Sequence, residues 1–152
     1  MKINKSSRHS KITGDFTENL VLYLLSKHGF ECANLDHTGI DLIARNPNNQ
    51  DVMGISVKGR SRTKEAIGTS ISIPTDNFEK VESACKAFNL KPYFAIVSDE
   101  VDKIHVFILS MEHLQKLSPS EKKIYTWKMD QKSISDYYDD AQILTLEFQE
   151  NR

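Results

Sequence analysis

The sequence predicts an α/β protein with a mixed sheet between helices, and two observations support this class. Helical and strand-like patterns follow one another in the order α, β, β, β, (β), α, β, β over the first two thirds of the chain. The last two of these segments, 91–98 and 103–110, are almost continuously apolar, as is typical of central strands buried on both faces. This order of elements favours a sheet carried between helices.

The first predicted helix covers residues 13–27. Thr13 is a suitable N-cap, and Asp15 and Glu18 stand in the first turns, where the helix dipole favours acidic side chains. Gly29 suits the end of this helix, because glycine readily adopts the left-handed conformation found there. A wide apolar face is expected to be formed by Phe16, Leu20, Val21, Leu22, Leu24 and Leu25.

Short strands are predicted next, at 31–35, 40–45 and 51–59. The second and third are separated by residues 46–50, whose asparagines and proline suit a hairpin loop. Residues 69–74 alternate polar and apolar side chains, which indicates a strand with one solvated face.

A second helix is predicted to open at Asp76, where Glu79 three residues later completes a capping-box pattern. After the two long apolar strands the patterns are weaker. A short helix is expected at 111–117, and strands are expected at 123–127 and 141–148. The core stripe of the second helix is expected to consist of Phe78, Val81, Cys85 and Phe88.

The 152 residues are expected to form one domain, with a basic arm at 1–12, a core at 13–110 and an extension without an assigned role at 111–152. No apolar run is long enough to span a bilayer, and no apolar segment follows the basic start. Neither a membrane span nor a secretory signal is therefore expected. The two cysteines have no metal or disulfide spacing, so a cytoplasmic location is expected.

Charge is unevenly distributed in a chain whose net charge is only −1. Residues 1–11 and 58–64 each carry four basic side chains and no acid, whereas residues 133–150 carry five acids and no Lys or Arg. Basic clusters can contact nucleic-acid phosphates on a neutral protein, although such runs are also common in solvated loops. The acidic segment is interpreted as a solvated surface.

The stretch GIDLIARNPNNQDVMGISVKG carries the main candidate for a functional site. Side chains alternate along a strand, so Ser56 and Lys58 share a face, and the hairpin is expected to place Asp41 beside them. Glu18 is expected to lean from the first helix toward the same place. His37 could reach this pocket too, although a loop histidine without a role there is the commoner case.

Carboxylates and a lysine at one sheet edge suit metal-assisted hydrolysis of a phosphodiester bond. Carboxylate oxygens hold Mg²⁺ or Mn²⁺ while leaving positions for water and a substrate phosphate. The ion activates the water and offsets negative charge, and a lysine can orient or deprotonate that water. The alternative is an ordinary structural Asp–Lys pair in a hairpin.

With these residues the chain resembles the PD-(D/E)xK nuclease superfamily, whose restriction-endonuclease-like fold includes archaeal Holliday-junction resolvases. The family core is αβββαβ, with an acid on the helix, an aspartate on the second strand and (D/E)-x-K on the third. By this resemblance Glu18 matches the helix acid, Asp41 in GIDLIA the aspartate and Lys58 in ISVKG the lysine. The resemblance covers residues 13–110 and implies metal binding by Glu18 and Asp41. Family members that cut both strands are often dimers, so a homodimer is an open expectation.

Ser56 departs from the family pattern, because it stands where the second acid of the motif is expected. A hydroxyl can support a metal-bound water but supplies no charge. Three explanations are open: Glu18 and Asp41 suffice for one ion, the acid has migrated to the second helix, or catalysis has been lost. Some restriction endonucleases with S-x-K use a migrated acid, and Glu82 is the better candidate here because Glu79 lies further round the helix.

The sequence therefore predicts a metal-dependent nuclease that hydrolyses phosphodiester bonds of DNA. Its predicted catalytic residues are Glu18, Asp41, Ser56 and Lys58, and its predicted backbone contacts are Arg60, Arg62 and Lys64. One alternative is a catalytically inactive nucleic-acid- or protein-binding module of the same fold. Another is a structural or immunity-type partner protein that uses the acidic segment as its interface.

Overall fold

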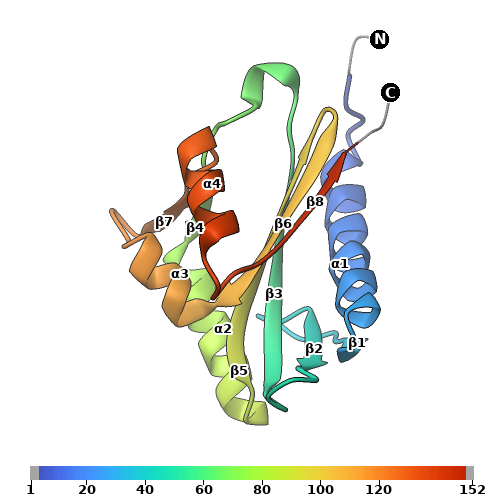
Figure 1. The fold of residues 1–152 in the computed structure, drawn as a ribbon, viewed down its shortest axis with the longest axis vertical. Coiled ribbons are helices and arrows are strands. Elements are labelled where there is room, and N and C mark those ends of the chain that lie inside the picture. The colour runs from blue at the N-terminus through green and yellow to red at the C-terminus, as the bar shows by residue number, and fades with distance from the viewer. Residues whose placement is uncertain (1–3, 150–152) are drawn as a thin grey trace.

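A computed structural model describes residues 4–149, in which a six-stranded sheet carries helices on both faces (Figure 1). The helices are α1 (His9–Lys27), α2 (Thr75–Phe88), α3 (Met111–Leu117) and α4 (Gln131–Asp139), with a 3-10 turn at Lys64–Ala66. The strands are β1 (Glu31–Asn34), β2 (Leu42–Arg45), β3 (Val52–Ser61), β4 (Ile71–Pro74), β5 (Lys91–Glu100), β6 (Lys103–Ser110), β7 (Ile124–Trp127) and β8 (Leu144–Gln149).

The main sheet has the strand order β1-β2-β3-β5-β6-β8. Strand β3 pairs antiparallel with β2 and parallel with β5, and every other pair in this sheet is antiparallel. The predicted hairpin between β2 and β3 is confirmed, since Leu42 faces Ile55 and Arg45 faces Val52. The predicted α/β class with a mixed sheet is thus confirmed.

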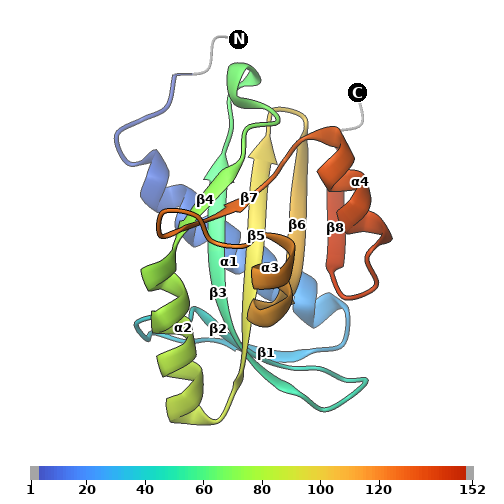
Figure 2. The ribbon, with the colours of Figure 1, turned by 90° about the vertical axis from the view of Figure 1, so that its left-hand side faces the viewer.

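Two hydrophobic cores lie on opposite faces of this sheet. Helix α1 covers one face, where Val21, Leu24 and Leu25 pack against apolar side chains of β2, β3, β5 and β6. Helices α2, α3 and α4 lie on the other side, as Figures 1 and 2 show. There Phe78 and Val81 of α2 belong to the second core, together with Phe94, Ile96, Phe107 and Leu109 of the central strands.

Helix α1 begins at His9, four residues before the predicted start. The prediction that Thr13 caps this helix is wrong, because its hydroxyl donates to the carbonyl of His9 one turn earlier, within the helix. Phe16 was expected in the core but is 44% exposed, since the buried face turns toward Thr17 and Val21 instead. The predicted end of the helix is confirmed, with His28 as C-cap and Gly29 at a φ of 85°.

Helix α2 begins at Thr75, with Pro74 as its N-cap residue, so Asp76 does not cap it. The predicted capping box of Asp76 and Glu79 is therefore wrong. Proline suits this position because it ends β4 and offers no backbone N–H that would need a partner. Phe88, predicted in the core stripe, is 54% exposed at the last turn.

The segment after β6 adds one strand to the main sheet and one strand to a second, smaller sheet. Strand β8 joins the main sheet beside β6, while β7 pairs with β4 in a separate two-stranded sheet. Trp127 of β7 is fully buried and stacks on Tyr137 with ring centroids 4.0 Å apart. Residues 111–143 therefore complete the second core, and Leu144 and Leu146 of β8 pack against the first, so this segment is not a detached appendage.

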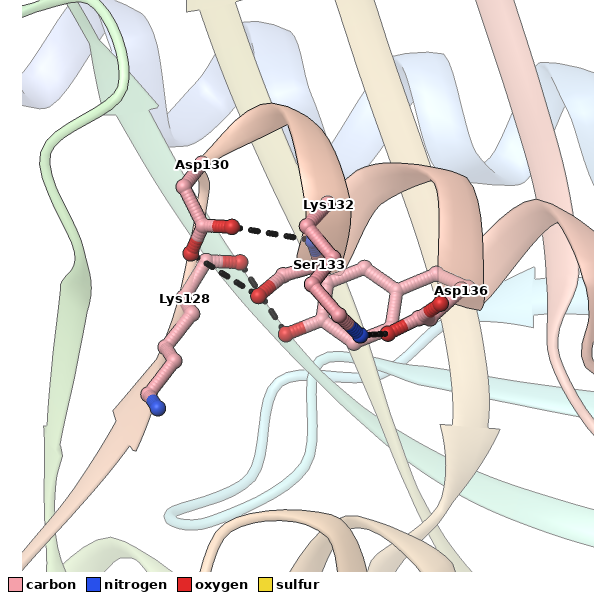
Figure 3. Close-up of polar contacts among 6 residues, drawn as sticks. Lys128, Asp130, Lys132, Ser133 and Asp136 are labelled. Atoms are coloured by element: carbon pink, nitrogen blue, oxygen red, sulfur yellow. Dashed lines mark hydrogen bonds and ion pairs between the residues drawn. The ribbon is translucent and has the colours of Figure 1, made fainter.

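Helix α4 was missed by the sequence prediction, which interpreted this acidic segment as a solvated surface. Asp130 caps the helix by accepting hydrogen bonds from the backbone N–H and the hydroxyl of Ser133, at 3.0 and 2.8 Å (Figure 3). Tyr137 is buried on the inner side, and its hydroxyl donates to the carbonyl of Lys128 at 3.0 Å. Among the helices of residues 4–149, none is long and apolar enough to cross a membrane.

Candidate functional site

Asp41 lies immediately before β2, at the place where the β2–β3 ladder ends. Its backbone N–H donates to the carbonyl of Ile55 at 2.8 Å. Its carboxylate Oδ2 accepts from the backbone N–H of Val57 at 2.7 Å. Since β2 pairs with β3 only as far as Ile55, the Asp41 side chain satisfies a donor that β2 no longer reaches. The carboxylate is thereby held at the edge of β3, beside Lys58.

Glu18 is brought toward Asp41 by a close contact between α1 and β3. A Cβ atom on Gly59 would lie 2.4 Å from the hydroxyl of Thr17, so only glycine permits this approach of the helix. Burial raises the pKa of Glu18, and the negative charges of Asp41 and Asp15 raise it further. The two carboxyl groups therefore lie close together, and the charge of Asp41 disfavours ionisation of Glu18.

Lys58 projects from β3 toward α2 and is partly buried. Its ammonium group donates to Oδ1 of Asn77, in the first turn of α2, at 2.6 Å. Burial lowers the pKa of Lys58, while the negative charge of Asp41 acts in the opposite direction. The lysine therefore stands in the electrostatic field of Asp41 without forming an ion pair with it.

Ser56 is buried, with 2% of its surface exposed, and pairs with Phe94 in the parallel β3–β5 ladder. Its position two residues before Lys58 keeps both side chains on the face of the sheet that carries α2. Glu82 is exposed on α2. It lies five residues after Asn77, about 140° around the helix axis, so the geometry does not bring Glu82 to this site. Asp76 is the acid of α2 whose charge acts on Lys58.

An open pocket of about 350 Å³ lies between α1 and the loop that joins β1 to β2. Four acids line it: Asp15, Glu18, Asp36 and Asp41. The sequence prediction did not assign Asp36 or Asp15 to the site, and the only signal available was their proximity in the chain to Asp41 and Glu18. His37 also lines the pocket, with its Nδ1 hydrogen-bonded to the carbonyl of Thr38 at 2.7 Å.

The donor set fits a hydrated Mg²⁺ ion. Mg²⁺ keeps several waters and is commonly held by one or two carboxylates together with substrate phosphate. Glu18 and Asp41 supply two such carboxylates. Burial, and then the negative charge of Asp41, raise the pKa of Glu18, and a cation between the two groups would favour its ionised form. Within residues 4–149 no group of three or more His, Cys, Asp or Glu side chains is arranged to hold a metal ion. Water and phosphate would have to complete the coordination shell.

The two arginines that follow Lys58 donate hydrogen bonds to backbone carbonyls from β3 to the start of β4. The guanidinium of Arg60 donates to the carbonyls of Gly59 and Ser72, at 2.8 and 3.4 Å. That of Arg62 donates to the carbonyl of Ser70 at 3.0 Å. Arg60 therefore links β3 to β4, whereas Arg62 holds the loop between these strands. Lys64 is exposed on the 3-10 turn within that loop. The predicted contacts of these basic residues with DNA stay a prediction.

The order of the strands, with α1 on one face and α2 on the other, defines a restriction-endonuclease-like fold. Among solved structures the chain is similar to Hjc, a Holliday junction resolvase from the archaeal hyperthermophile Archaeoglobus fulgidus. That likeness has a TM-score of 0.57 at 18% identity, over 85% of this chain and 90% of Hjc, and is a likeness of fold. No protein-family model and no curated protein matches the sequence.

Proposed function

We propose that this protein is a metal-dependent nuclease that hydrolyses phosphodiester bonds of DNA. The observation that carries the proposal is the pairing of Glu18 with Asp41 in an acidic pocket, with Lys58 close enough for its charge to interact with Asp41. The fold, shared with a Holliday junction resolvase, supports the same conclusion and makes four-way-junction DNA the first substrate to test.

Glu18 and Asp41 are the residues that would hold the ion. Asp41 is oriented by the N–H of Val57, which donates to Oδ2 and leaves the rest of the carboxylate for a ligand. A bound divalent ion supplies an activated water and offsets negative charge on the phosphate. Ionisation of Glu18 is the step that prepares the pair for the ion, because burial and Asp41 together favour its protonated form.

Lys58 is proposed to act on the attacking water or on the phosphate. Burial lowers its pKa, which raises the fraction of neutral amine able to accept a proton near neutral pH. The protonated form can instead donate to a phosphate oxygen. Asn77 accepts a hydrogen bond from the ammonium group and is therefore a positioning residue for Lys58.

A catalytically inactive DNA-binding module of the same fold is the second candidate, and Ser56 is the observation that favours it. Serine at this position supplies no carboxylate where the second acid of the motif is expected, and among the described residues no three-ligand metal group is found. Ser56 lies buried between strands, where it can support neighbouring groups but contributes no charge.

Cleavage of duplex, single-stranded and four-way-junction DNA and of RNA, with Mg²⁺ or Mn²⁺, tests the proposal. Asp41→Asn is the sharpest variant, because its amide oxygen can still accept from Val57 while the negative charge is lost. Loss of a contribution of several kcal/mol from the ion lowers the rate by about 100-fold or more, at 1.36 kcal/mol for each tenfold change.

Asp36→Asn is the matched comparison, since it removes one charge from the same pocket without changing a residue that matches the family motif. Metal-dependent cleavage that is lost in Asp41→Asn and largely kept in Asp36→Asn supports the nuclease. Wild-type protein that binds DNA but cuts none of the four substrates would instead establish the inactive module.

A further inference from the structure

A second pocket, of about 400 Å³, lies where the start of α1 approaches the end of β3. Its walls come from two segments that are far apart in the sequence, and the ammonium group of Lys5 joins them by donating to the carbonyl of Ser61 at 2.6 Å. The polar side chains that line it include Lys5, Ser6, His9, Ser10, Arg60 and Ser61.

The charge of this pocket is opposite to that of the neighbouring acidic pocket. Lys5 and Arg60 are positive, and none of the lining residues carries a carboxylate. Four acids line the other pocket, which lies further along α1. Lysine, arginine and hydroxyl groups are the donors that proteins commonly direct at phosphate oxygens. The pocket therefore selects an anion, and its chemistry fits a phosphate group.

Several polar groups of this pocket have hydrogen-bonding capacity that the protein itself does not use. In the part of the chain that the structure describes, Nε2 of His9 is shielded from solvent and has no hydrogen-bond partner. A polar atom left in this state is uncommon in folded proteins and calls for an explanation such as a missing ligand. Lys5 uses one of three ammonium donors on Ser61, and Arg60 keeps guanidinium donors beyond those bound to Gly59 and Ser72.

The position of the pocket relates it to the proposed reaction. Arg60, which lines the pocket, follows Lys58 by two residues on β3 and therefore lies on the same face of the strand, about 7 Å away at about 3.3 Å for each residue. One strand of DNA carries a phosphate for about every 3.4 Å of helix axis. A strand that places one phosphate at Lys58 can therefore place another, a few nucleotides away, in this pocket.

We propose that this pocket binds a backbone phosphate of the DNA strand, at a fixed number of nucleotides from the phosphate at Lys58. The proposal rests on the proposed nuclease function. It adds a second contact, which would fix how the DNA strand is positioned along the protein relative to Lys58. Lys5 and His9 are positioning residues in this scheme, because they hold DNA without touching the reacting atoms.

Neutral methylphosphonate groups, placed one at a time along a DNA strand, test the proposal when binding is measured in the presence of EDTA. Wild-type protein is expected to lose affinity at one position beyond those near Lys58. In Lys5→Gln and His9→Gln that positional effect is expected to disappear. Once the protein side of the contact has been removed, neutralising the DNA phosphate has no further contact to remove. Lys5→Gln should also reduce the slope of log K against log salt by about 1.

Lys11→Gln is the matched control, because Lys11 lies near Lys5 in the sequence, on α1, but is 75% exposed and paired with Asp15. It makes the same change of charge and is expected to keep the positional effect. A positional effect that persists in both Lys5→Gln and His9→Gln overturns the proposal. So does the finding that inorganic phosphate shifts the ring signals of His9 while DNA does not, which would make this a site for free phosphate.

Mg²⁺ calorimetry and cleavage assays on the same proteins separate this proposal from the nuclease. Lys5→Gln and His9→Gln are expected to bind Mg²⁺ as the wild type does, since neither residue lines the acidic pocket. If the wild-type protein shows the positional effect but never cuts DNA, the proposal of a phosphate pocket is supported and the proposed nuclease function is rejected. If the protein cuts DNA without any positional effect, the nuclease function is supported and the phosphate pocket is rejected.

Discussion

Glu18 and Lys58 both have a pKa displaced in the direction that disfavours the charged form, and burial is the main cause in each case. Structural ion pairs are normally arranged to favour both charges. Displacements of this kind cluster at functional sites, where a cation or substrate supplies what the free protein lacks. At the residue scale, the unfavourable ionisation of Glu18 and Lys58 is the clearest indication of a functional site.

Replacing Lys58 by methionine is expected to keep or raise stability while abolishing cleavage. Because burial lowers the pKa in the folded state, the folded protein binds fewer protons than the unfolded chain between the two pKa values. The charged lysine therefore destabilises the fold at neutral pH, and this effect diminishes as pH rises through the folded pKa. Urea unfolding at pH 7 measures the change, and a clear loss of stability would contradict it.

Mg²⁺ binding is expected to strengthen as pH rises through the raised pKa of Glu18. The ordinary value is 4.5, and burial together with Asp41 displaces the folded pKa upward. At pH values between the ordinary pKa and the raised pKa of Glu18, protons therefore compete with the ion. An unperturbed carboxylate would already be ionised in this pH range. Calorimetric titration from about pH 5 to about pH 8 measures this dependence.

Glu18→Gln provides the comparison for the pH experiment. The amide cannot ionise, so its weaker Mg²⁺ affinity should change little over the same range. Equal pH dependence in both proteins would assign the titration to another group.

At the element scale, the contact between α1 and β3 decides where Glu18 lies. Gly59→Ala would push a methyl group against the side chain of Thr17, which is fully packed on β3. Overpacking of this kind costs about 1–3 kcal/mol. The variant is expected to melt at a lower temperature and to bind Mg²⁺ more weakly, because the helix that carries Glu18 must move away from Asp41.

Gly14→Ala is the matched change for Gly59→Ala, since a Cβ atom on Gly14 meets no atom within 4 Å. Alanine at this partly exposed position of α1 should stabilise the protein by about 0.5–1 kcal/mol, through the loss of backbone freedom in the unfolded chain. Thermal unfolding compares the two. Equal effects of both alanines would show that the close approach at Gly59 has no importance.

Across the whole molecule, occupation of the acidic pocket should stabilise the fold. A ligand at a concentration of 100 times its Kd adds about 2.7 kcal/mol. For a chain of this size each kcal/mol raises Tm by roughly 2–4 °C, so a rise of roughly 5–10 °C is expected with saturating Mg²⁺. Calorimetry of the wild type and Asp41→Asn, with Mg²⁺ and with EDTA, tests this, and an equal rise in both proteins would place the ion elsewhere.

The core elements could be predicted from the sequence because each carries a local pattern. Apolar continuity identified β5 and β6, and the turn residues between β2 and β3 identified their hairpin. Helix α4 was missed because it is short and acidic, and its identity depends on Tyr137 packing against Trp127 from another segment. The starts of α1 and α2 were misplaced because the cap residues proposed for them lie inside the helices.

Local sequence determined which residue types stand on which strand, and so it could place Asp41 and Lys58 on neighbouring strands of one hairpin. Only the tertiary structure decided that Glu18 lies beside Asp41, because this depends on the close approach of Thr17 to Gly59. Only it decided that Asn77, and not Glu82, faces the site from α2. The reason is physical: periodicity specifies the face of an element, while packing between distant segments specifies which faces meet.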